Sequence, residues 1–267
     1  MTKVIWSQSV VPGSVLIAAP ATTSDPFWSN VVLLMGFEGT NGSTGAPGMT
    51  DESPAAHGTG TVTFDATIST AHAKAGLSSL ALTTAGSNGK SVVQWPTSTD
   101  WNLGSSPFTI EFFYAGLGLR GSGAQIIFQG PNGNYQFYYG GLVLTFTATD
   151  GSSTVTLSEP VNIPDSSADW FYICVDFDGS KYRLYNNFSG SSGNPPPLAT
   201  ASMVSSSTSV ITIATSATPI QFGSASATIF VNTCDCWIDE FRFTKGVARY
   251  ATNGSFPVPT APFPRHA

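Results

Sequence analysis

The stretch FTIEFFYAGL, Phe108–Leu117, alternates large apolar side chains with unlike neighbours over most of its length. Phe108, Ile110 and Phe112 share one parity, whereas Glu111 falls on the other. A period of two is that of a β-strand whose two faces meet different surroundings. The stretch therefore predicts a central strand of a sheet with unlike faces.

Similar short segments recur along the chain and are separated by glycine, proline and asparagine turns. They include VVLLMGF (Val31–Phe37), AQIIFQG (Ala124–Gly130), YQFYYGG (Tyr135–Gly141) and LVLTFTATD (Leu142–Asp150). The 27 glycines and 18 prolines interrupt the chain too often for long helices. About a dozen short strands with tight turns predict one all-β domain, a two-sheet antiparallel sandwich of the jelly-roll type.

Charge and hydropathy exclude two classes of partner. The net charge is -6, the pI is near 4.8, and no cluster of lysine and arginine occurs, so binding to nucleic acid is not expected. No apolar run reaches the roughly 18 residues that span a bilayer, so membrane insertion is not expected either. The apolar segment near the start is interrupted by proline and glycine, and we expect no signal peptide.

Three cysteines, Cys174, Cys234 and Cys236, cannot form a closed set of disulfides. A bridge between two cysteines that are two residues apart on one strand would be strained, so free thiols are favoured. Zinc is a weak alternative, because the three histidines of the chain do not show ligand spacing.

Three regions are expected: residues 1–30 as an extended N-terminal arm, residues 31–250 as the sandwich, and residues 251–267 as a proline-rich C-terminal tail. Prolines at intervals favour an extended arm, which needs a surface to lie against. That surface is either another protein of an assembly or the arm's own domain. The apolar side chains predicted to dock the arm are Trp6, Leu16, Ile17, Phe27 and Trp28.

A series of motifs between Val31 and Pro264 resembles a known family. In order, they are FEGTNGS (Phe37–Ser43), ISTAHAKAGLSSLAL (Ile68–Leu82), DWNLGSSPFTIEFF (Asp100–Phe113), DWFYICVDFDGSKYRLYNN (Asp169–Asn187), PIQFG (Pro219–Gly223), CWIDEFRFTKGVARY (Cys236–Tyr250) and PVPTAPFP (Pro257–Pro264). Their succession resembles that of laminin-G-like, concanavalin-A-like jelly-roll domains. The last strand and the exit resemble those of such domains in bacteriophage virion proteins, including tail fibres and decoration proteins.

That resemblance implies a non-enzymatic structural protein at the virion surface, made in the host cytoplasm, with roles in adhesion or glycan binding. The implied partners are other virion proteins, copies of the same chain and host-surface glycans. A free-standing carbohydrate-binding lectin is the alternative, and a glycoside hydrolase is a less favoured one. A fold by itself does not decide among these functions.

Asp239 falls on the same parity as Trp237, Phe241 and Phe243, which places a carboxylate in an apolar row. An uncompensated buried charge is costly, so something should neutralise it. One alternative is that Asp239 accepts backbone N–H groups at a bend and binds no metal.

The resemblance implies a second alternative, a structural calcium ion. Related jelly rolls hold calcium between an acid of the last strand and oxygens at the exit of the first strand. Here those ligands would be Asp239 with Glu38 and Gly39, and Asp51 is a looser candidate. Calcium takes oxygen ligands of this kind.

Aromatic and amide side chains around YQFYY are candidates for glycan binding. The predicted site residues are Tyr135, Phe137, Tyr139, Asn134 and Trp101. Gln136 and Tyr138 fall on the opposite face of the same strand. The alternative for each aromatic residue is core packing or an interface with another subunit.

Enzyme activity is not expected. The five glutamates are scattered, whereas glycosidases bring two carboxylates close together. Asp176 and Asp178 share a face, but Asp178 begins a D-G turn. His57 and His72 lie in segments typical of loops, so no histidine-centred triad is predicted. Glu240 and Arg242 are expected to form a weak pair at the surface.

Overall fold

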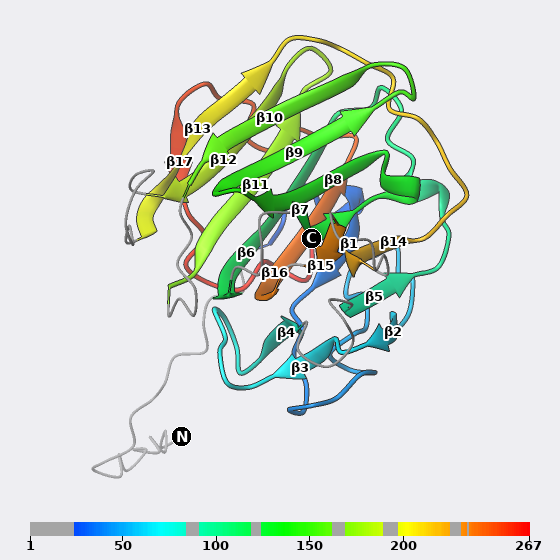
Figure 1. Ribbon diagram of the computed structural model, residues 1–267, viewed down its shortest axis with the longest axis vertical. Helices are drawn as coiled ribbons and strands as arrows, with labels where there is room; N and C mark the ends of the chain where they lie inside the picture. The colour runs from blue at the N-terminus through cyan, green and yellow to red at the C-terminus, as the bar shows by residue number, and fades with distance from the viewer. Residues whose placement is uncertain are drawn as a thin grey trace, which may run out of the picture.

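The computed structural model describes residues 24–83, 91–118, 124–161, 169–188, 197–224, 231–233 and 235–267. In these ranges nearly all regular structure is β-strand, and the strands form two sheets packed face to face (Figure 1). The predicted all-β, two-sheet antiparallel sandwich is confirmed. Among the described strand pairs, one is parallel, formed by β15 (Val231–Thr233) and β7 (Ala124–Gln129).

The first sheet has the strand order β17-β13-β12-β11-β6-β16-β4-β3, and β1 also pairs with β16. Its strands are β1 (Val31–Met35), β3 (Thr67–Ser69), β4 (Ser79–Leu82), β6 (Phe108–Gly118), β11 (Phe171–Phe177), β12 (Tyr182–Phe188), β13 (Pro197–Ser207), β16 (Asp235–Lys245) and β17 (Ser255–Pro257). The central position of β6, between β11 and β16, is as predicted.

The second sheet has the order β10-β9-β8-β7-β14-β5-β2, with β15 beside β7. Its other strands are β2 (Thr61–Phe64), β5 (Ser91–Trp95), β8 (Tyr135–Gly140), β9 (Val143–Thr149), β10 (Thr154–Pro160) and β14 (Ile220–Ser224). Figure 1 shows β9 and β10 crossing in front of β11 and β12 of the first sheet.

Three short 3-10 turns, η1 (Trp28–Asn30), η2 (Thr99–Trp101) and η3 (Pro131–Gly133), are the helical elements of the described residues. None of them has the length or the hydropathy of a helix that crosses a membrane.

The main hydrophobic core lies between the two sheets. Phe108, Ile110 and Phe112 of β6 are buried there, and the ring of Phe112 meets Phe137 of β8 edge-on, with centroids 5.2 Å apart. Successive side chains of β6 therefore point alternately into this core and towards the outer side of the first sheet, which Glu111 faces.

The C-terminal segment covers the outer side of the first sheet and forms a second core with it. Phe113 and Tyr172 of the sheet pack with Val258 and Phe263. β17 pairs with β13, and the backbone N–H of Asp25 donates to the carbonyl oxygen of His266 at 2.9 Å. The expected C-terminal tail is thus an integral part of the sandwich.

Only the last part of the expected N-terminal arm lies within the described residues. Trp28 packs against the second core, and Asp25 is buried. From residue 24 onward the chain therefore lies against its own domain, which was one of the two alternatives. Trp6, Leu16 and Ile17 lie outside the described residues.

β1 and β16 are antiparallel neighbours, as expected if the last long strand lies beside the first. β16 contains a bulge between Asp239 and Arg242, where Glu240 has a φ of 49°. An extra residue reverses which parity faces which side. Phe241 and Phe243 consequently lie in the main core, whereas Asp239 does not share their face, and that prediction was wrong.

Glu240 and Arg242 are both buried and do not form the predicted surface pair. Arg242 Nε donates to Glu111 Oε1 at 2.9 Å, and its Nη1 donates to Asp25 Oδ2 at 3.0 Å. Glu240 accepts from Arg265 at 2.8 Å. The prediction was wrong because Asp25 and the C-terminal residues Phe263 and Arg265 cover these side chains of β16.

Candidate functional site

The five residues predicted to bind glycan are not available to a ligand. Tyr135, Phe137 and Tyr139 of β8, together with Trp101 of η2, lie in the main core, and Asn134 is buried in the turn before β8. Tyr135 Oη donates to the carbonyl oxygen of Trp101 at 2.9 Å, and Asn134 Nδ2 donates to a backbone carbonyl at 2.7 Å. The prediction was wrong because the odd-numbered side chains of β8 face the other sheet.

The even-numbered side chains of β8 project from the outer face of the second sheet. Gln136 is aligned there with residues of six other strands, and directly paired residues project from the same face. From β10 to β2 the aligned residues are Thr156, Thr147, Gln136, Gln129, Gln221, Gln94 and Thr61. All seven are exposed or partly exposed, and we call them the glutamine row.

The described strands carry no charged side chain on the face of the glutamine row. The seven strands from β10 to β2 contain one charged residue, Glu159, which has the parity of the core-facing Leu157. Hydroxyl and amide groups therefore supply the polarity of this face. Such a surface offers hydrogen-bond donors and acceptors, and it has no net electrostatic potential that would attract ions of one sign.

A pocket of about 490 Å³ opens beside the glutamine row at the turn between β7 and β8. It is lined by Gln129, Gly130, Asn132, Gly133, Gln136, Thr218, Pro219 and Gln221. The side-chain oxygens of Gln129 and Gln136 lie 3.9 and 3.8 Å from the point where a Cβ on Gly133 would stand. Two amides from neighbouring strands thus converge beside a residue that has no side chain.

Hydrogen bonds within the protein orient two side-chain amides of the glutamine row, and two others remain available to a ligand. Gln94 Nε2 donates to Gln221 Oε1 at 3.1 Å, and Gln221 Nε2 donates to the carbonyl oxygen of Gly223 at 3.3 Å. Among the described residues, no group holds the side-chain amides of Gln129 and Gln136. A ligand in the pocket therefore meets one oriented amide and two unoccupied ones.

Tyr138 adds an aromatic ring to the same face. It pairs with Ile126 of β7 and Thr145 of β9, and it is partly exposed. Being two residues from Gln136, it stands roughly 7 Å along the strand on the same side. The ring offers an apolar surface next to the amides.

Asp239, the first predicted calcium ligand, is occupied by backbone donors. Its Oδ2 accepts the N–H groups of Lys74 and Ala75 at 2.7 and 3.0 Å, and its Oδ1 accepts that of Glu240 at 2.8 Å. Burial raises the pKa of Asp239 to about 8, and the charge of Glu240 acts in the same direction against the N–H bonds.

Glu38 and Gly39, the next two predicted calcium ligands, are hydrogen-bonded to the segment of Leu77 and Ser78. Glu38 accepts the N–H of Leu77 at 3.0 Å, and the Gly39 N–H donates to Ser78 Oγ at 2.9 Å. In the described part of the chain, no three His, Cys, Asp or Glu side chains are arranged to hold a metal. N–H groups point their positive ends at the carboxylate oxygens of Asp239 and Glu38, so these two carboxylates do not fit calcium.

Asp51, the looser calcium candidate, belongs to a histidine-centred cluster that the sequence did not predict. His57 Nδ1 lies 3.0 Å from Asp51 Oδ2. His57 Nε2 lies 3.2 Å from Ser98 Oγ and 3.0 Å from Asp100 Oδ2. The order Ser98, His57, Asp51 is that of a catalytic triad, and loops remote in sequence bring it together.

The hydrogen bonds of this cluster indicate a structural role. Carboxylate oxygens only accept, so a His57 Nε2 that donates to Asp100 has no lone pair to take a proton from Ser98. Ser98 Oγ also accepts the backbone N–H of Asp100 at 3.1 Å, as the N-cap of η2. The cluster joins the loop around Asp51 to η2.

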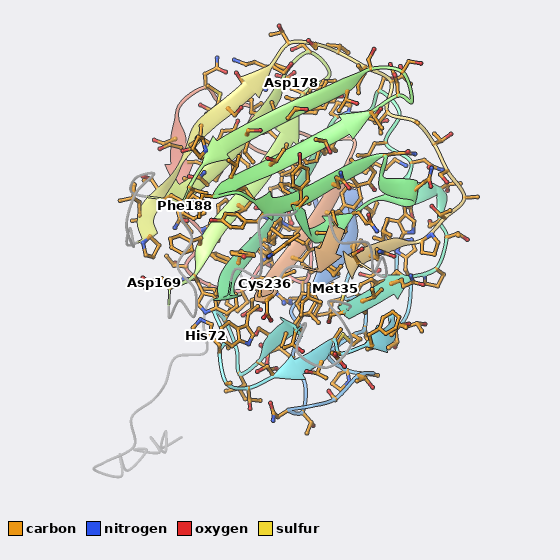
Figure 2. The ribbon with its side chains drawn as sticks, viewed as in Figure 1. Met35, His72, Asp169, Asp178, Phe188 and Cys236 are labelled. Atoms are coloured by element: carbon orange, nitrogen blue, oxygen red, sulfur yellow. The ribbon has the colours of Figure 1, made fainter. Side chains whose placement is uncertain are left out.

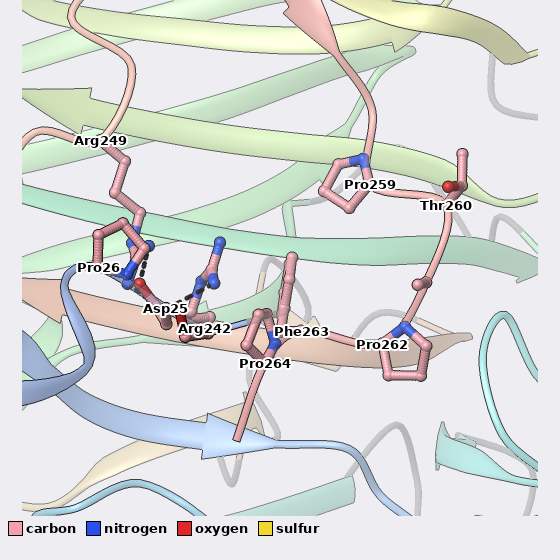
Figure 3. A pocket seen from close by; sticks show the side chains of 11 residues that line it. Asp25, Pro26, Arg242, Arg249, Pro259, Thr260, Pro262, Phe263 and Pro264 are labelled. Carbon is pink, nitrogen blue, oxygen red and sulfur yellow. Dashed lines mark hydrogen bonds and ion pairs between the residues drawn. The ribbon is translucent and has the colours of Figure 1, made fainter. Parts of the chain in front are cut away.

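Charged side chains gather on the outer side of the first sheet (Figure 3). Asp25 accepts from Arg249 at 3.0 and 2.8 Å and from Arg242 at 3.0 Å. Glu111 accepts from Arg242 at 2.9 Å and from Tyr250 Oη at 2.7 Å. Burial alone would raise the pKa of Asp25, but the bonds from Arg249 and a backbone N–H hold it below the ordinary value.

A pocket of about 430 Å³ borders this ionic cluster, and Pro259, Pro262 and Phe263 form part of its wall. Figure 3 shows Asp25 between the two guanidinium groups at the pocket. Each of these charges is already paired with another residue of the cluster. The cluster therefore fastens the segment around Asp25 to the first sheet.

Asp176 and Asp178 also serve the backbone. Asp176 accepts the N–H of Ala251 at 2.7 Å, and burial raises its pKa to about 6. Asp178 accepts the N–H of Ser180 at 2.8 Å in the predicted turn. Figure 2 shows Asp178 at the opposite end of β11 from Asp169.

Cys174 is a free thiol within the second core, and burial raises its pKa. Cys236 is buried in the main core. Cys234 lies outside the described residues, so the expectation for all three thiols stays a prediction.

The fold and this face define a two-sheet antiparallel β-sandwich with an amide-lined surface, on which the described strands place no charged side chain. No protein-family model and no curated protein matches the chain, whereas solved structures do. The binding domain of botulinum neurotoxin DC in complex with SialylT matches with 14% identity and a TM-score of 0.54, over 82% of this chain and 48% of that one. The same domain in complex with rat synaptotagmin II matches with 13% identity, a TM-score of 0.54 and the same coverage.

Domain 4 of AbnA, an extracellular GH43 arabinanase from Geobacillus stearothermophilus, in complex with arabinotriose, is similar over more of its own length. It has 16% identity and a TM-score of 0.56, and the match covers 81% of this chain and 93% of that one. This chain spans about half the length of the neurotoxin domains. At such identities the likeness concerns the fold.

Proposed function

We propose that this chain is a non-enzymatic adhesion module that binds carbohydrate through the glutamine row and its pocket. The observation that carries the proposal is a set of four amides at one level of four adjacent strands, on an uncharged sheet face: Gln136, Gln129, Gln221 and Gln94. An amide both donates and accepts, as does each sugar hydroxyl, so one amide can bind two neighbouring hydroxyls.

The surroundings of the amides support this assignment. The pocket gives concave contact, and the ring of Tyr138 gives an apolar surface on which a sugar ring face can stack. Proteins with a similar fold have saccharide ligands: AbnA domain 4 was solved with arabinotriose, and cell entry of botulinum neurotoxin type C depends on two ganglioside molecules.

The carboxylates support a binding role over hydrolysis. A glycosidase needs two carboxyl groups about 5 to 10 Å apart on either side of the bond that is cleaved. Glu159, the one acid of the strands from β10 to β2, has the parity of the core side. Asp25 and Glu111 of the other side are held by arginines.

On the resemblance to bacteriophage virion domains, we further propose that the module is carried at the virion surface as a fibre or decoration protein. Of the expected arm, residues 1–30, the part before residue 24 would dock it on other virion proteins or on copies of itself. Asp25 belongs to the cluster on the outer side of the first sheet, whereas the glutamine row lies on the outer side of the second. A module held by its arm would therefore present the row away from the particle.

Glycan arrays followed by calorimetric titration test the carbohydrate proposal. Gln136→Met keeps the length of the side chain and removes its hydrogen-bonding groups, so affinity should fall about tenfold. The control is Thr200→Val on the exposed side of β13, which should bind as the wild type does. A folded wild-type protein that binds no saccharide would sink the proposal.

Deletion of residues 1–23 tests the docking proposal, because it leaves Asp25 and Trp28 in their domain. The truncated protein should fold and should no longer be incorporated into particles. Normal incorporation of the truncated protein would contradict arm-mediated docking. It would not contradict the proposal that the sandwich binds carbohydrate.

A further inference from the structure

We infer that the ligand of the glutamine row is a linear, uncharged oligosaccharide that lies across the strands, in the direction from β2 to β10. This inference rests on the proposed carbohydrate binding. It specifies the charge, the length and the direction of the ligand, which a single sugar held in the pocket would not require.

The length follows from the register of the second sheet. Seven residues of the row lie on seven consecutive strands, so six inter-strand spacings separate Thr156 from Thr61. At about 4.8 Å for each spacing, the row is about 29 Å long. A single sugar ring covers a small part of that length, whereas a chain of several sugars could contact the whole row.

The direction follows from the way in which the row is interrupted along the strands. Neighbours of Gln136 within β8 are the core residues Tyr135 and Phe137, so polar groups repeat along a strand only at every second residue. Across the strands, a polar side chain stands at every step of the row. An extended polar ligand therefore finds more hydrogen bonds across the strands than along them.

The absence of charge follows from the lining of the row and of the pocket. Both consist of glutamine, asparagine, threonine, glycine and proline residues, with no arginine, lysine or histidine among them. Binding a carboxylate or a sulfate in a partly buried site without a cation or an oriented N–H cluster is costly. The site therefore favours neutral sugars over acidic ones.

The pocket supplies the central subsite. The free amides of Gln129 and Gln136 and the oriented amide of Gln221 would hold one sugar there. Sugars on either side would lie over Thr147 towards β10 and over Gln94 and Thr61 towards β2. Affinity should therefore grow with chain length on both sides of the pocket.

Calorimetric titration with cello-, xylo- and arabino-oligosaccharides of one to six units is the direct test, with sialyllactose and oligogalacturonates as acidic probes. We expect at least one neutral series to bind, with an affinity that rises about tenfold or more from the disaccharide to the hexasaccharide. The acidic probes should bind more weakly than the neutral series. Circular dichroism and thermal melting confirm that each variant is folded.

Three variants separate the subsites. Gln136→Met should lower the affinity for every length about tenfold, because it removes a pocket amide. Thr147→Val and Thr61→Val should each lower the affinity for the hexasaccharide about threefold and leave that for the disaccharide unchanged. Thr200→Val, on the other sheet, is the control and should change neither.

The outcomes distinguish this inference from the proposed function. Binding of acidic sugars alone, an affinity independent of length, or a hexasaccharide affinity unaffected by Thr147→Val and Thr61→Val would overturn the inference while carbohydrate binding stood. Failure of every saccharide to bind the folded protein would overturn both.

Discussion

Arg249 and Asp25 form a two-point ion pair, with Nη1 3.0 Å from Oδ1 and Nη2 2.8 Å from Oδ2, although 224 residues separate them in sequence. Their side chains are 6% and 0% exposed. A bidentate pair of this kind couples its partners firmly as long as both are present. It fastens the chain just before β1 to the turn that follows β16.

Loss of one partner should therefore destabilise the sandwich strongly. Asp25→Asn removes the counter-charge that Arg249 and Arg242 share and leaves Arg249 with only the more distant Glu111, 3.7 Å from its Nε. We expect the free energy of unfolding to fall by about 3 to 5 kcal/mol. Urea denaturation measures the change. Asp150→Asn lies in an exposed turn, and its amide oxygen can still accept the Ser152 and Ser153 N–H groups. It is the matched control and should change the free energy of unfolding by less than about 0.5 kcal/mol. A fall of less than about 1 kcal/mol for Asp25→Asn would mean that the pair is not stabilising in solution.

Asp239 should make stability depend on pH. Burial raises the pKa of this carboxyl from 3.8 to about 8. The folded state then binds more protons than the unfolded state between about pH 4 and about pH 8, so the free energy of unfolding falls as pH rises through that window.

Asp239→Asn should remove this part of the pH dependence. Urea denaturation of both proteins at about pH 5 and about pH 8 measures it, and Asp176, whose pKa is raised to about 6, contributes equally to both. We expect the wild type to lose stability relative to the variant as pH rises. Parallel pH profiles would show that Asp239 titrates near its ordinary value.

Calcium should leave the melting temperature of the chelator-treated protein unchanged. The oxygens of Asp239 and Glu38 face backbone N–H groups, which repel a cation. Differential scanning fluorimetry with millimolar calcium, and with magnesium as the control, measures this. A rise with calcium alone would restore the metal site that the sequence suggested.

Gly130 has no room for a side chain. A Cβ there would stand 2.2 Å from the Tyr135 ring, which is buried and held by its hydroxyl. We expect Gly130→Ala to lower the free energy of unfolding by about 1 to 3 kcal/mol. Gly45→Ala, with no atom within 4 Å of the new Cβ, is the control. Equal urea midpoints for the two variants would contradict this packing.

Ser98 should not behave as a nucleophile, because His57 Nε2 is shared with Asp100. A fluorophosphonate probe that modifies activated serines should leave the protein unlabelled, as judged by intact-mass spectrometry. A mass shift that disappears in Ser98→Ala would identify a working triad and would contradict the non-enzymatic proposal.

The sequence predicts those parts of the fold that depend on local alternation. Phe108, Ile110 and Phe112 face the main core because a strand with a period of two has no other way to bury all three. The resemblance to jelly-roll domains also implied that the last long strand lies near the first, and in the structure the two are paired. The bulge at Glu240 was not predicted. One inserted residue places Asp239 and Phe241 on opposite faces of the sheet, and no local pattern in the sequence indicates where such a residue lies.

The candidate site was harder to predict than the fold. In YQFYY both parities carry aromatic residues, so alternation separates Tyr135 from Gln136 but does not say which of them faces solvent. The glutamine row depends on the register of six strand pairs, and register is a property of the assembled sheet. Each of its glutamines, taken alone in the sequence, is an ordinary polar residue of a strand.

The hydrogen bond from the Asp25 N–H to the His266 carbonyl oxygen brings two distant segments of the described chain within reach of a short linker. Joining residue 24 to residue 267 and opening the chain at Gly151, in the exposed turn between β9 and β10, would give a circular permutant that keeps every described strand pair. Its new ends would leave from the edge of the second sheet, so a surface could be coated with the same sandwich in a different orientation.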